Sequence, residues 1–372
     1  MEDGYPIRPT DVQHRIEQFD GLRALAFSAV FVHHAFGLPL LWAGVDLFFV
    51  LSGFIITSIL RRERKAIGKA KRFYIRRVCR IVPPYLLLLV CVGLVFGIPR
   101  STWIWYATFF GINVAQGIGI IKDGPLSPLW SLAIEEQFYL VWPFLVFRLS
   151  RRKLLLTTVG LILSSAFLRG LCTTFINTLG PIYCLTPFRL DTLAAGSLAA
   201  LLWEAQPPLR HWRRWSILLL CAGAGGVCAL YLMPASRTDQ ARIFVNAFRY
   251  TFVGAFATGV VMYSVASPPD SWPYLLLSWK PFRGLGVVSY TAYLFHQPML
   301  ALWVHDTAVE RAILAFVATI GFAALSWFIY ERPIIGWGHR IAPQAISGDY
   351  IRTITSPHCA KPASLAPSAL LQ

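Results

Sequence analysis

Long apolar runs recur along nearly the whole chain, and they constrain its fold more than any other feature. The sequence is 56% hydrophobic with a mean hydropathy of +0.56. A run of about 17 to 25 mainly apolar residues is long enough to cross a bilayer as an α-helix. Such runs lie near residues 21–40, 42–60, 81–98, 132–148, 154–176, 187–203, 215–233, 243–266, 287–304 and 311–330. The sequence therefore predicts an all-α, polytopic membrane bundle of about ten transmembrane helices.

The charged residues indicate how this bundle is oriented. The chain has 34 Lys and Arg against 18 Asp and Glu, and residues 61–80 are especially basic. Loops rich in Lys and Arg tend to stay in the cytoplasm, and the basic loops at 148–153, 209–215 and 279–284 fall on the same side if ten spans alternate. We therefore expect both termini in the cytoplasm and the protein in the cell inner (plasma) membrane. The net charge of +16 belongs mainly to these loops, so we do not expect nucleic-acid binding.

The chain divides into three predicted regions. Residues 1–20 form a cytoplasmic N-terminal segment, 21–337 the integral membrane domain, and 338–372, rich in Ser, Pro and Ala, a disordered cytoplasmic tail. The apolar segment 103–121 would place the basic loop at 148–153 outside if it counted as a further span. We interpret it as re-entrant or interfacial, which is tolerated at membrane depth when the segment packs in protein or lines a cavity. The first span lacks a small-residue cleavage site and is expected to be retained.

His34 is the first polar residue of interest, because an ionisable residue inside a bilayer is costly and usually faces a cavity or a partner. A helix turns about 100° per residue, so His34 shares a face with Asp20 and Arg23, whereas His33 does not. His34 either hydrogen-bonds to a helix neighbour or acts as a general base, since a neutral imidazole accepts a proton near pH 7. Periodicity alone leaves both interpretations open.

A general base needs a partner that orients it, and two carboxylates begin predicted helices on the same membrane side as His34. Asp46 starts the second span and Glu135 opens the fourth. Either carboxylate would stabilise the imidazolium that forms when the histidine takes a proton. The alternative for Glu135 and Glu136 is favourable placement of negative charge at a helix N-terminus. Glu331, just before Arg332 and Pro333, is interpreted as part of a helix-end charge pair.

Seven short stretches occur in a fixed order along the chain. They are DGLRALA with His34 fourteen residues after Asp20, GVDLFFVLSGFIIT (44–57), FYIRRVCRIVPPY (73–85), WSLAIEEQFYLVWP (130–143), FRLDTLAAG (188–196), SYTAYLFHQP (289–298) and YERP (330–333). In this order they resemble the motif series of the acyltransferase family three membrane proteins. These include bacterial O-antigen and exopolysaccharide O-acetyltransferases, nodulation-factor modifiers and macrolide O-acyltransferases. The resemblance covers about residues 15–337.

The resemblance implies transfer of an acyl group, commonly acetyl, from a cytoplasmic coenzyme A thioester to a hydroxyl of a sugar-containing acceptor. His34 matches the family's essential first-helix histidine, and its basic motifs are matched by Arg23, Arg76, Arg77 and Arg80. Arginine offers a planar, permanently charged fork that suits the phosphates of coenzyme A. The alternative explanation for these arginines is the positive-inside bias together with attraction to anionic lipid. We expect no permanently bound cofactor, with acetyl-CoA or another acyl-CoA as donor substrate.

Four further polar residues are candidates for a substrate path or for structural roles. Arg189 and Asp191 lie in the sixth span and call for pairing, either as an ion pair or as lining of the acyl passage. The small residues after them, AAGSLAA, favour close helix packing. Ser52 has no neighbouring base in sequence and suits a helix contact better than an acyl carrier, and His296 suits a core histidine better than a catalyst. The seven cysteines form no CxxC pair, so no metal site is expected.

The mechanism, the acceptor and one alternative function stay open at this level. Direct transfer with His34 as base and transfer through an acyl-histidine intermediate are both compatible with the residues. The expected partners are acyl-CoA, membrane lipids and a glycan, glycolipid or macrolide acceptor, with a separate extracytoplasmic transfer partner as an option because no large soluble domain is left over. The alternative function is a lipid-linked sugar transporter or flippase, although the internal repeats frequent in transporters are not evident.

Overall fold

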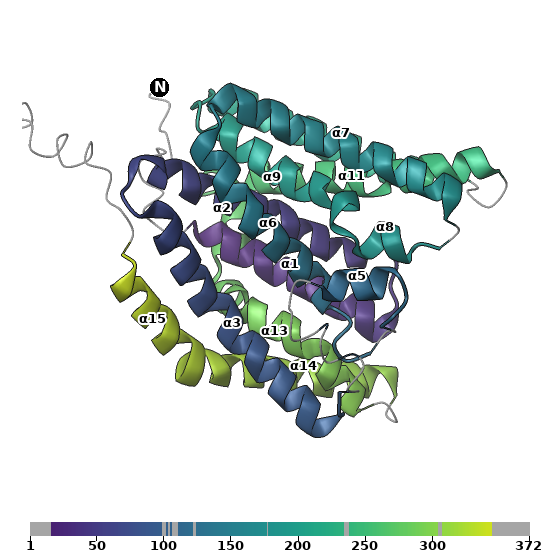
Figure 1. The fold of residues 1–372 in the computed structure, drawn as a ribbon, viewed down its shortest axis with the longest axis vertical. Helices are drawn as coiled ribbons and strands as arrows, with labels where there is room; N and C mark the ends of the chain where they lie inside the picture. The colour runs from purple at the N-terminus through teal and green to yellow at the C-terminus, as the bar shows by residue number, and fades with distance from the viewer. Residues whose placement is uncertain are drawn as a thin grey trace, which may run out of the picture.

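The computed structural model describes residues 16–98, 102, 105, 111–121, 124–176, 178–233, 238–303 and 307–343, and the regular structure in them is helical throughout. The long helices are α1 (Glu17–Phe36), α2 (Gly44–Arg62), α3 (Lys69–Val95), α6 (Leu129–Arg148), α7 (Arg151–Phe175), α9 (Leu190–Trp203), α10 (Leu209–Leu232), α11 (Asp239–Val265), α13 (Lys280–Leu302) and α14 (Ala308–Ser326). Shorter elements are η2 (Leu41–Ala43), η3 (Glu63–Lys65), α5 (Ile112–Gly117), α8 (Gly180–Cys184), η4 (Thr186–Phe188), α12 (Trp272–Ser278), the π-helical turn η5 (Trp327–Glu331) and α15 (Arg332–Ile341). Figure 1 shows α1, α2, α7, α9 and α11 running side by side, with α3 and α15 along another edge. The predicted all-α class is confirmed.

Each predicted span overlaps one of the long helices. Among the described residues, six helical stretches are long and apolar enough to cross a membrane: Leu41–Lys65, Lys69–Val95, Arg151–Phe175, Leu209–Leu232, Asp239–Val265 and Ala308–Ile341. Helix α9 is apolar but shorter. The count of ten crossings therefore stays a prediction. Most of the predicted N-terminal segment and tail lies outside the described residues, and α15 continues to Ile341.

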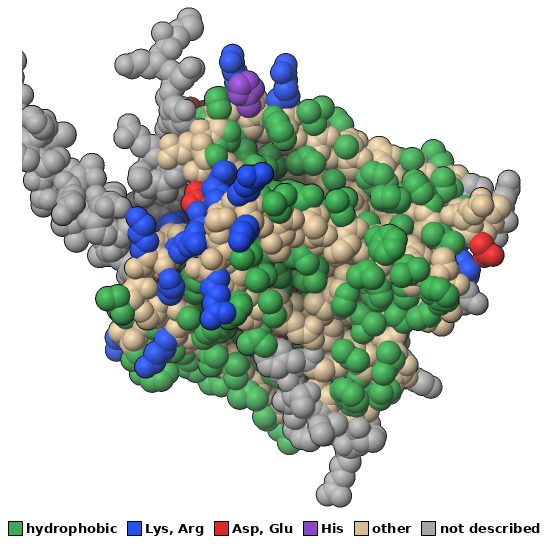
Figure 2. Space-filling model, turned by 45° about the horizontal axis from the view of Figure 1, so that its top comes forward, with side chains coloured by type: hydrophobic (Ala, Val, Ile, Leu, Met, Phe, Trp, Pro, Cys, Tyr) green, Lys and Arg blue, Asp and Glu red, His purple; other side chains and the backbone are tan. Residues whose placement is uncertain are grey.

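Helix α3 begins well before the span that we predicted at 81–98. It starts at Lys69, after Gly68 with φ of 67°, and includes the part of the basic run from Lys69 to Arg80. The difference arises because Lys and Arg are good helix formers, so nothing between Lys69 and Arg80 ends the helix. Figure 2 shows Lys and Arg side chains gathered on one side of the molecule, over the region where α2 joins α3. Charge and apolar surface are thus segregated, as the sequence predicts.

Glycines bring the backbones of α2 and α9 into contact. A Cβ added at Gly53 would lie 2.0 Å from the Leu193 carbonyl oxygen, and one at Gly196 would lie 2.0 Å from the Val50 carbonyl oxygen. Ser197 Oγ donates to the Gly53 carbonyl at 3.3 Å across the same contact. Small residues permit such close approach of membrane helices. The predicted close packing of the AAGSLAA segment is confirmed.

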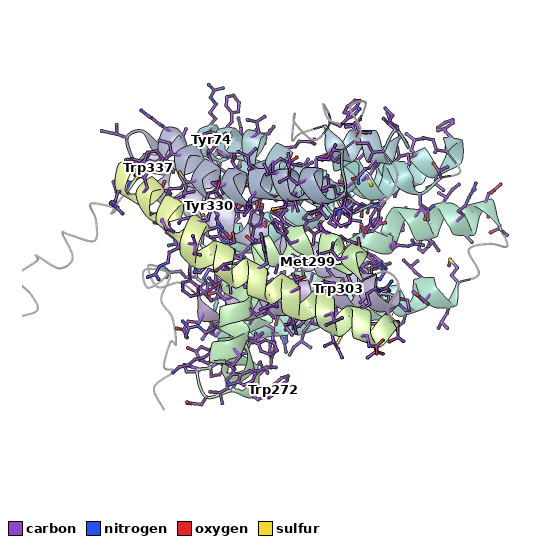
Figure 3. The ribbon with its side chains drawn as sticks, turned by 90° about the horizontal axis from the view of Figure 1, so that it is seen from below. Tyr74, Trp272, Met299, Trp303, Tyr330 and Trp337 are labelled. Atoms are coloured by element: carbon purple, nitrogen blue, oxygen red, sulfur yellow. The ribbon has the colours of Figure 1, made fainter. Side chains whose placement is uncertain are left out.

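Large apolar side chains cover the outward faces of several helices. Figure 3 shows α14 continuing through η5 into α15 as one rod, along which Tyr330 and Trp337 are labelled. Exposed apolar residues on α7, α10 and this rod include Leu156, Leu163, Phe167, Leu218, Leu232, Val317, Phe328 and Ile329. Exposed apolar surface of this extent is typical of a protein that is surrounded by lipid.

The described part of the segment at 103–121 packs partly inside the protein, while Val114, Ile118 and Ile120 are exposed. It holds α5, whose Asn113 is fully buried. Asn113 Nδ2 donates to the Cys184 carbonyl at 3.2 Å and to Thr186 Oγ1 at 3.0 Å. These contacts fix α5 against α8 and η4, which fits the rule that short helical breaks are tolerated when they are enclosed by protein. The re-entrant path itself stays a prediction, because residues 103–104 and 106–110 lie outside the described residues.

Candidate active site

A cavity of about 90 Å³ lies between α1, α2, α3, α6 and α13 and gathers polar residues from all of them. Its polar lining consists of Arg23, Ser52, Arg77, Arg80, Ser131, Glu135, Tyr139, Ser289, Tyr290 and Tyr293. The remaining lining residues are apolar, for example Val45 and Phe48. A concave, partly apolar site with convergent polar groups is the usual form of a small-molecule site. Five sequence-predicted site residues thus meet in one cavity, although they come from four different helices.

Glu135 accepts two hydrogen bonds in this cavity. Ser52 Oγ donates to its Oε1 at 2.8 Å, and the Tyr139 hydroxyl donates to its Oε2 at 3.1 Å. The Tyr139 ring also carries the guanidinium of Arg77, which lies 4.4 Å from the ring centroid. Ser52 therefore has an acidic neighbour 83 positions away along the chain, which no inspection of the adjacent sequence reveals.

Three of the four arginines that we predicted to bind the donor line the cavity. Arg77 and Arg80 come from one face of α3, because residues three apart are neighbours on a helix. Arg23 joins them from α1, with its Nη1 3.5 Å from the buried carboxylate of Asp20. The three guanidinium groups give the cavity a positive wall.

Arg76 has a different place in the structure. Its Nη2 donates to Glu63 Oε1 at 2.6 Å, and its Nη1 donates to the Ala342 carbonyl at 3.1 Å. These bonds tie the turn before α3 to the end of α15. Arg76 is not among the residues that line the cavity.

Tyr293 connects the cavity wall to a pair of histidines. Its hydroxyl lies 2.7 Å from Ser131 Oγ and 3.4 Å from the Pro128 carbonyl oxygen, to which it donates. Its ring centroid lies 5.4 Å from that of His296, one helical turn further along α13. His296 is fully buried, and neither it nor His34 is among the residues that line the cavity.

His34 lies beside His296. His34 Nδ1 and His296 Nε2 are 3.0 Å apart, although 262 positions separate them in the sequence. His33 has a different hydrogen-bond partner, since its Nδ1 lies 2.8 Å from the Leu38 carbonyl oxygen just after α1, although its ring centroid is 5.2 Å from that of His34. The two adjacent histidines therefore have different surroundings, as the helical periodicity predicts. In place of the carboxylate contact that we expected, the structure gives His34 an imidazole partner.

Asp46 contacts Arg189 rather than a histidine. Asp46 Oδ1 accepts from Arg189 Nη2 at 2.8 Å, and both side chains are 0% exposed. The guanidinium also lies 3.8 Å from the ring centroid of Tyr250 and 5.4 Å from that of Trp130. The ion pair that we considered between Arg189 and Asp191 is thus replaced by one across helices, because residues two apart point to different sides of a helix.

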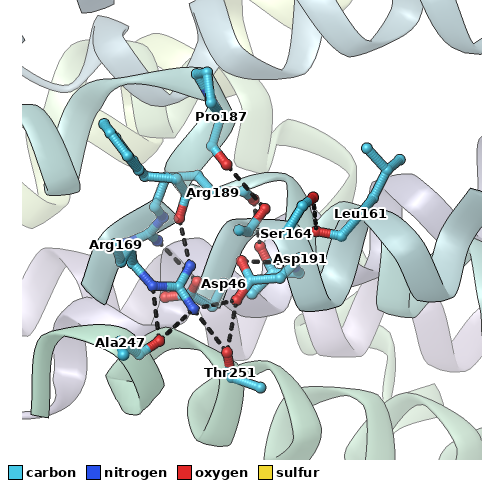
Figure 4. A network of polar contacts seen from close by, with 12 residues as sticks. Asp46, Leu161, Ser164, Arg169, Pro187, Arg189, Asp191, Ala247 and Thr251 are labelled. Atoms are coloured by element: carbon cyan, nitrogen blue, oxygen red, sulfur yellow. Dashed lines mark hydrogen bonds and ion pairs between the residues drawn. The ribbon is translucent and has the colours of Figure 1, made fainter. Parts of the chain in front are cut away.

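Asp191 pairs with Arg169, a residue that the sequence analysis missed. Arg169 Nη2 donates to Asp191 Oδ2 at 2.8 Å, to Thr251 Oγ1 at 2.7 Å and to the Ala247 carbonyl at 2.8 Å (Figure 4). The Arg169 side chain is 0% exposed. The sequence does contain a signal for this pair, because Arg169 lies in the middle of the predicted span 154–176. Arginines inside a membrane are rare and usually paired.

Glu331 is buried rather than placed as a helix-end charge. Thr291 Oγ1 and Ser326 Oγ both donate to its Oε1, at 2.7 and 2.8 Å. Our interpretation was wrong because the π-helical turn η5 turns Glu331 towards α13. Single π-helical turns of this kind are frequent at functional sites.

Known proteins resemble this chain over most of its length. A family model described as an acyltransferase domain matches residues 16–331. The peptidoglycan O-acetyltransferase OatA of Listeria monocytogenes is 33% identical, covering 86% of this chain and 56% of the relative. The putative peptidoglycan O-acetyltransferase YrhL of Bacillus subtilis is 31% identical, covering 88% and 56%, and the O-acetyltransferase OatA of Staphylococcus aureus is 31% identical, covering 85% and 56%.

The chain spans about half the length of the curated relatives that it matches. No solved structure matches it. The match to the family model nevertheless includes the whole cavity, the histidine pair and both buried ion pairs. The chain therefore belongs to the acyltransferase family 3 membrane proteins.

Proposed function

We propose that this protein is a membrane-bound O-acetyltransferase that moves an acetyl group from cytoplasmic acetyl-CoA to a hydroxyl of a cell-envelope glycan. The observation that carries the proposal is the cavity, which has an arginine wall and includes Tyr293, whose ring packs against His296, the partner of His34. Two of these relatives suggest an acceptor class, since one is a peptidoglycan O-acetyltransferase and the other a putative one. We accordingly propose a peptidoglycan-type glycan as acceptor.

The arginine wall suits the donor. Coenzyme A carries a diphosphate and a ribose phosphate, and Arg23, Arg77 and Arg80 present permanently charged donors to a phosphate-bearing ligand at this cavity. Each charged hydrogen bond contributes about 1.5 to 3 kcal/mol. The thioester would then extend along the cavity towards Tyr293.

The transfer step needs a base for a hydroxyl that is otherwise a poor nucleophile. His34 takes the hydroxyl proton of the acceptor as the oxygen attacks the thioester carbonyl carbon. The carbon–sulfur bond breaks, and the leaving thiolate takes the proton from the His34 imidazolium, so that the products are an O-acetyl ester and coenzyme A.

The two predicted catalytic carboxylates take different parts in this proposal. Glu135 lies in the cavity and orients the hydroxyls of Ser52 and Tyr139. Asp46 holds Arg189 in a fully buried pair and so supports the packing of α2 on α9. Neither role requires contact with His34.

The proposal is tested with the purified protein, acetyl-CoA labelled in the acetyl group, and isolated cell-wall glycan. We expect label in the glycan as an alkali-labile ester, with one free coenzyme A thiol released per ester formed. A lipid-linked sugar transporter would leave the label in acetyl-CoA. A folded protein that neither binds acetyl-CoA nor labels glycan contradicts the proposal.

A further inference from the structure

The hydrogen-bond partners of His296 fix where its ring hydrogen lies. Its Nδ1 is 2.5 Å from the Tyr293 carbonyl oxygen. A carbonyl oxygen only accepts, so Nδ1 of His296 must carry a hydrogen. The ring is fully buried and lies among the rings of Phe27, Tyr293 and His34, with centroids 6.3, 5.4 and 5.0 Å away. A second ring hydrogen would create a charge in these surroundings, which is unfavourable, so Nε2 of His296 carries a lone pair.

This assignment fixes the hydrogen of His34 in turn. Nε2 of His296 is 3.0 Å from Nδ1 of His34, and one of the two atoms must donate. Because His296 Nε2 accepts, His34 Nδ1 carries the hydrogen. A neutral imidazole has only one N–H, so Nε2 of His34 carries a lone pair.

We propose that His296 is a positioning residue that holds His34 as the Nδ1–H tautomer and thereby makes Nε2 of His34 the atom that takes the proton. This inference rests on the proposed function, in which His34 is the general base. When Nε2 takes the acceptor's hydroxyl proton, Nδ1–H of the imidazolium still donates to His296, and the bond becomes charge-assisted. In Ser-His-Asp triads a carboxylate holds the histidine in this way. Here a neutral imidazole, anchored on a backbone carbonyl, takes that place.

The packing of α1 on α13 makes this arrangement rigid. A Cβ added at Gly286 on α13 would lie 1.9 Å from the Asp20 carbonyl oxygen on α1, so the two backbones are in contact. The ring of Phe27 also stands edge-on to His296, with an interplanar angle of 87°. The separation of the two imidazoles is therefore set by the helices and not only by side-chain rotamers.

The tautomer is measured by ¹⁵N NMR of the full-length protein in lipid nanodiscs, with ¹⁵N-labelled histidine rings. The eight histidines are distinguished by comparison with His34→Gln and His296→Gln, and His211→Gln serves as control because His211 lies exposed on α10. We expect a protonated Nδ1 and an unprotonated Nε2 for His34, with a coupling from its Nδ1–H to His296. A wild-type His34 with its hydrogen on Nε2 overturns the inference, whether or not the protein transfers acetyl groups.

Kinetics supply a second test. His296→Leu removes the hydrogen-bond acceptor of His34 Nδ1. We expect kcat to fall about 100-fold while KM for acetyl-CoA stays within about twofold. His296→Gln keeps an oxygen that can accept from His34 Nδ1, so its kcat should be about tenfold higher than that of His296→Leu. Wild-type kcat in a folded His296→Leu protein overturns the inference. An Nδ1–H His34 in a wild-type protein that transfers no acetyl supports the tautomer assignment and contradicts the proposed function instead.

Discussion

The carboxylate of Asp46 lies 2.8 Å from the guanidinium of Arg189, and both side chains are fully buried where α2 meets α9. The backbone contact at Gly53 and Gly196 brings these helices together. The Tyr250 ring, 3.8 Å from the guanidinium, adds a cation–π contact. Such a pair holds two helices in one relative position, and removing either partner leaves an uncompensated buried charge.

Breaking this pair is expected to destabilise the protein. Asp46→Asn should lower the free energy of unfolding by about 3 to 5 kcal/mol, because Arg189 would stay buried without its counter-charge. Asp239→Asn is the matched control, since the Asp239–Arg242 pair is largely exposed and worth about 0 to 1 kcal/mol. Thermal melting of both variants in the same detergent measures the difference. Equal melting temperatures for Asp46→Asn and wild type would show that the pair does not hold the helices.

The α2–α9 contact should also be sensitive to a single methyl group. Gly53→Ala places a Cβ 2.0 Å from the Leu193 carbonyl oxygen, so the helices must separate, at a cost of about 1 to 3 kcal/mol or more. Gly160→Ala on α7 is the control, because nothing lies within 4 Å of its Cβ. The folded fraction after detergent extraction, measured by size-exclusion chromatography, should fall for Gly53→Ala only. A loss of similar size in both variants would point to general sensitivity rather than to this contact.

The arginines should separate into donor-binding and structural groups. Arg77→Ala and Arg80→Ala each remove a charge from the cavity wall, and we expect acetyl-CoA to bind about tenfold or more weakly, equivalent to at least about 1.4 kcal/mol. Arg76→Ala should lower the melting temperature instead, because it frees the buried Glu63 carboxylate, and leave acetyl-CoA affinity near wild type. Equilibrium binding of labelled acetyl-CoA measures all three variants. Weaker binding in Arg76→Ala at an unchanged melting temperature would contradict this division.

Substitution of Ser52 and a search for its acetylation test whether the acetyl group is held covalently on this serine during transfer. We predict that Ser52 orients Glu135 and carries no acetyl group, so Ser52→Ala should retain activity within about tenfold of wild type. Peptide mass spectrometry after brief mixing with acetyl-CoA measures the modification, with Ser289 on the same cavity as an internal comparison. An acetyl group that appears on Ser52 and disappears when glycan is added would make Ser52 a covalent carrier.

The sequence predicts the positions of the helices better than the contacts that their side chains make. Apolar runs indicate one helix for each predicted span, because every buried backbone group in a membrane must be satisfied within its own helix. The start of α3 at Lys69 could not be predicted from hydropathy, since a basic run forms a helix as readily as an apolar one. The π-helical turn that buries Glu331 depends on contacts with α13, which the local sequence does not contain.

Contacts between distant residues account for the rest of what the sequence could not predict. Periodicity separates His34 from His33, yet the partner of His34 is 262 positions away and comes from another helix. Asp46 was expected near His34 because both lie at the same membrane side, but the glycine contact of α2 with α9 directs it to Arg189. Three of the four predicted arginines do share one cavity, since motif position already places them at neighbouring helix ends.

The measurement that tests the account most directly is acetyl transfer from labelled acetyl-CoA to cell-wall glycan by wild type, His33→Ala and His34→Ala. The two variants remove adjacent imidazoles, but only His34 contacts His296. We predict near wild-type transfer for His33→Ala and at least about 100-fold slower transfer for His34→Ala, with acetyl-CoA affinity and melting temperature unchanged. Full turnover by a folded His34→Ala protein would contradict the assignment of His34 as the base.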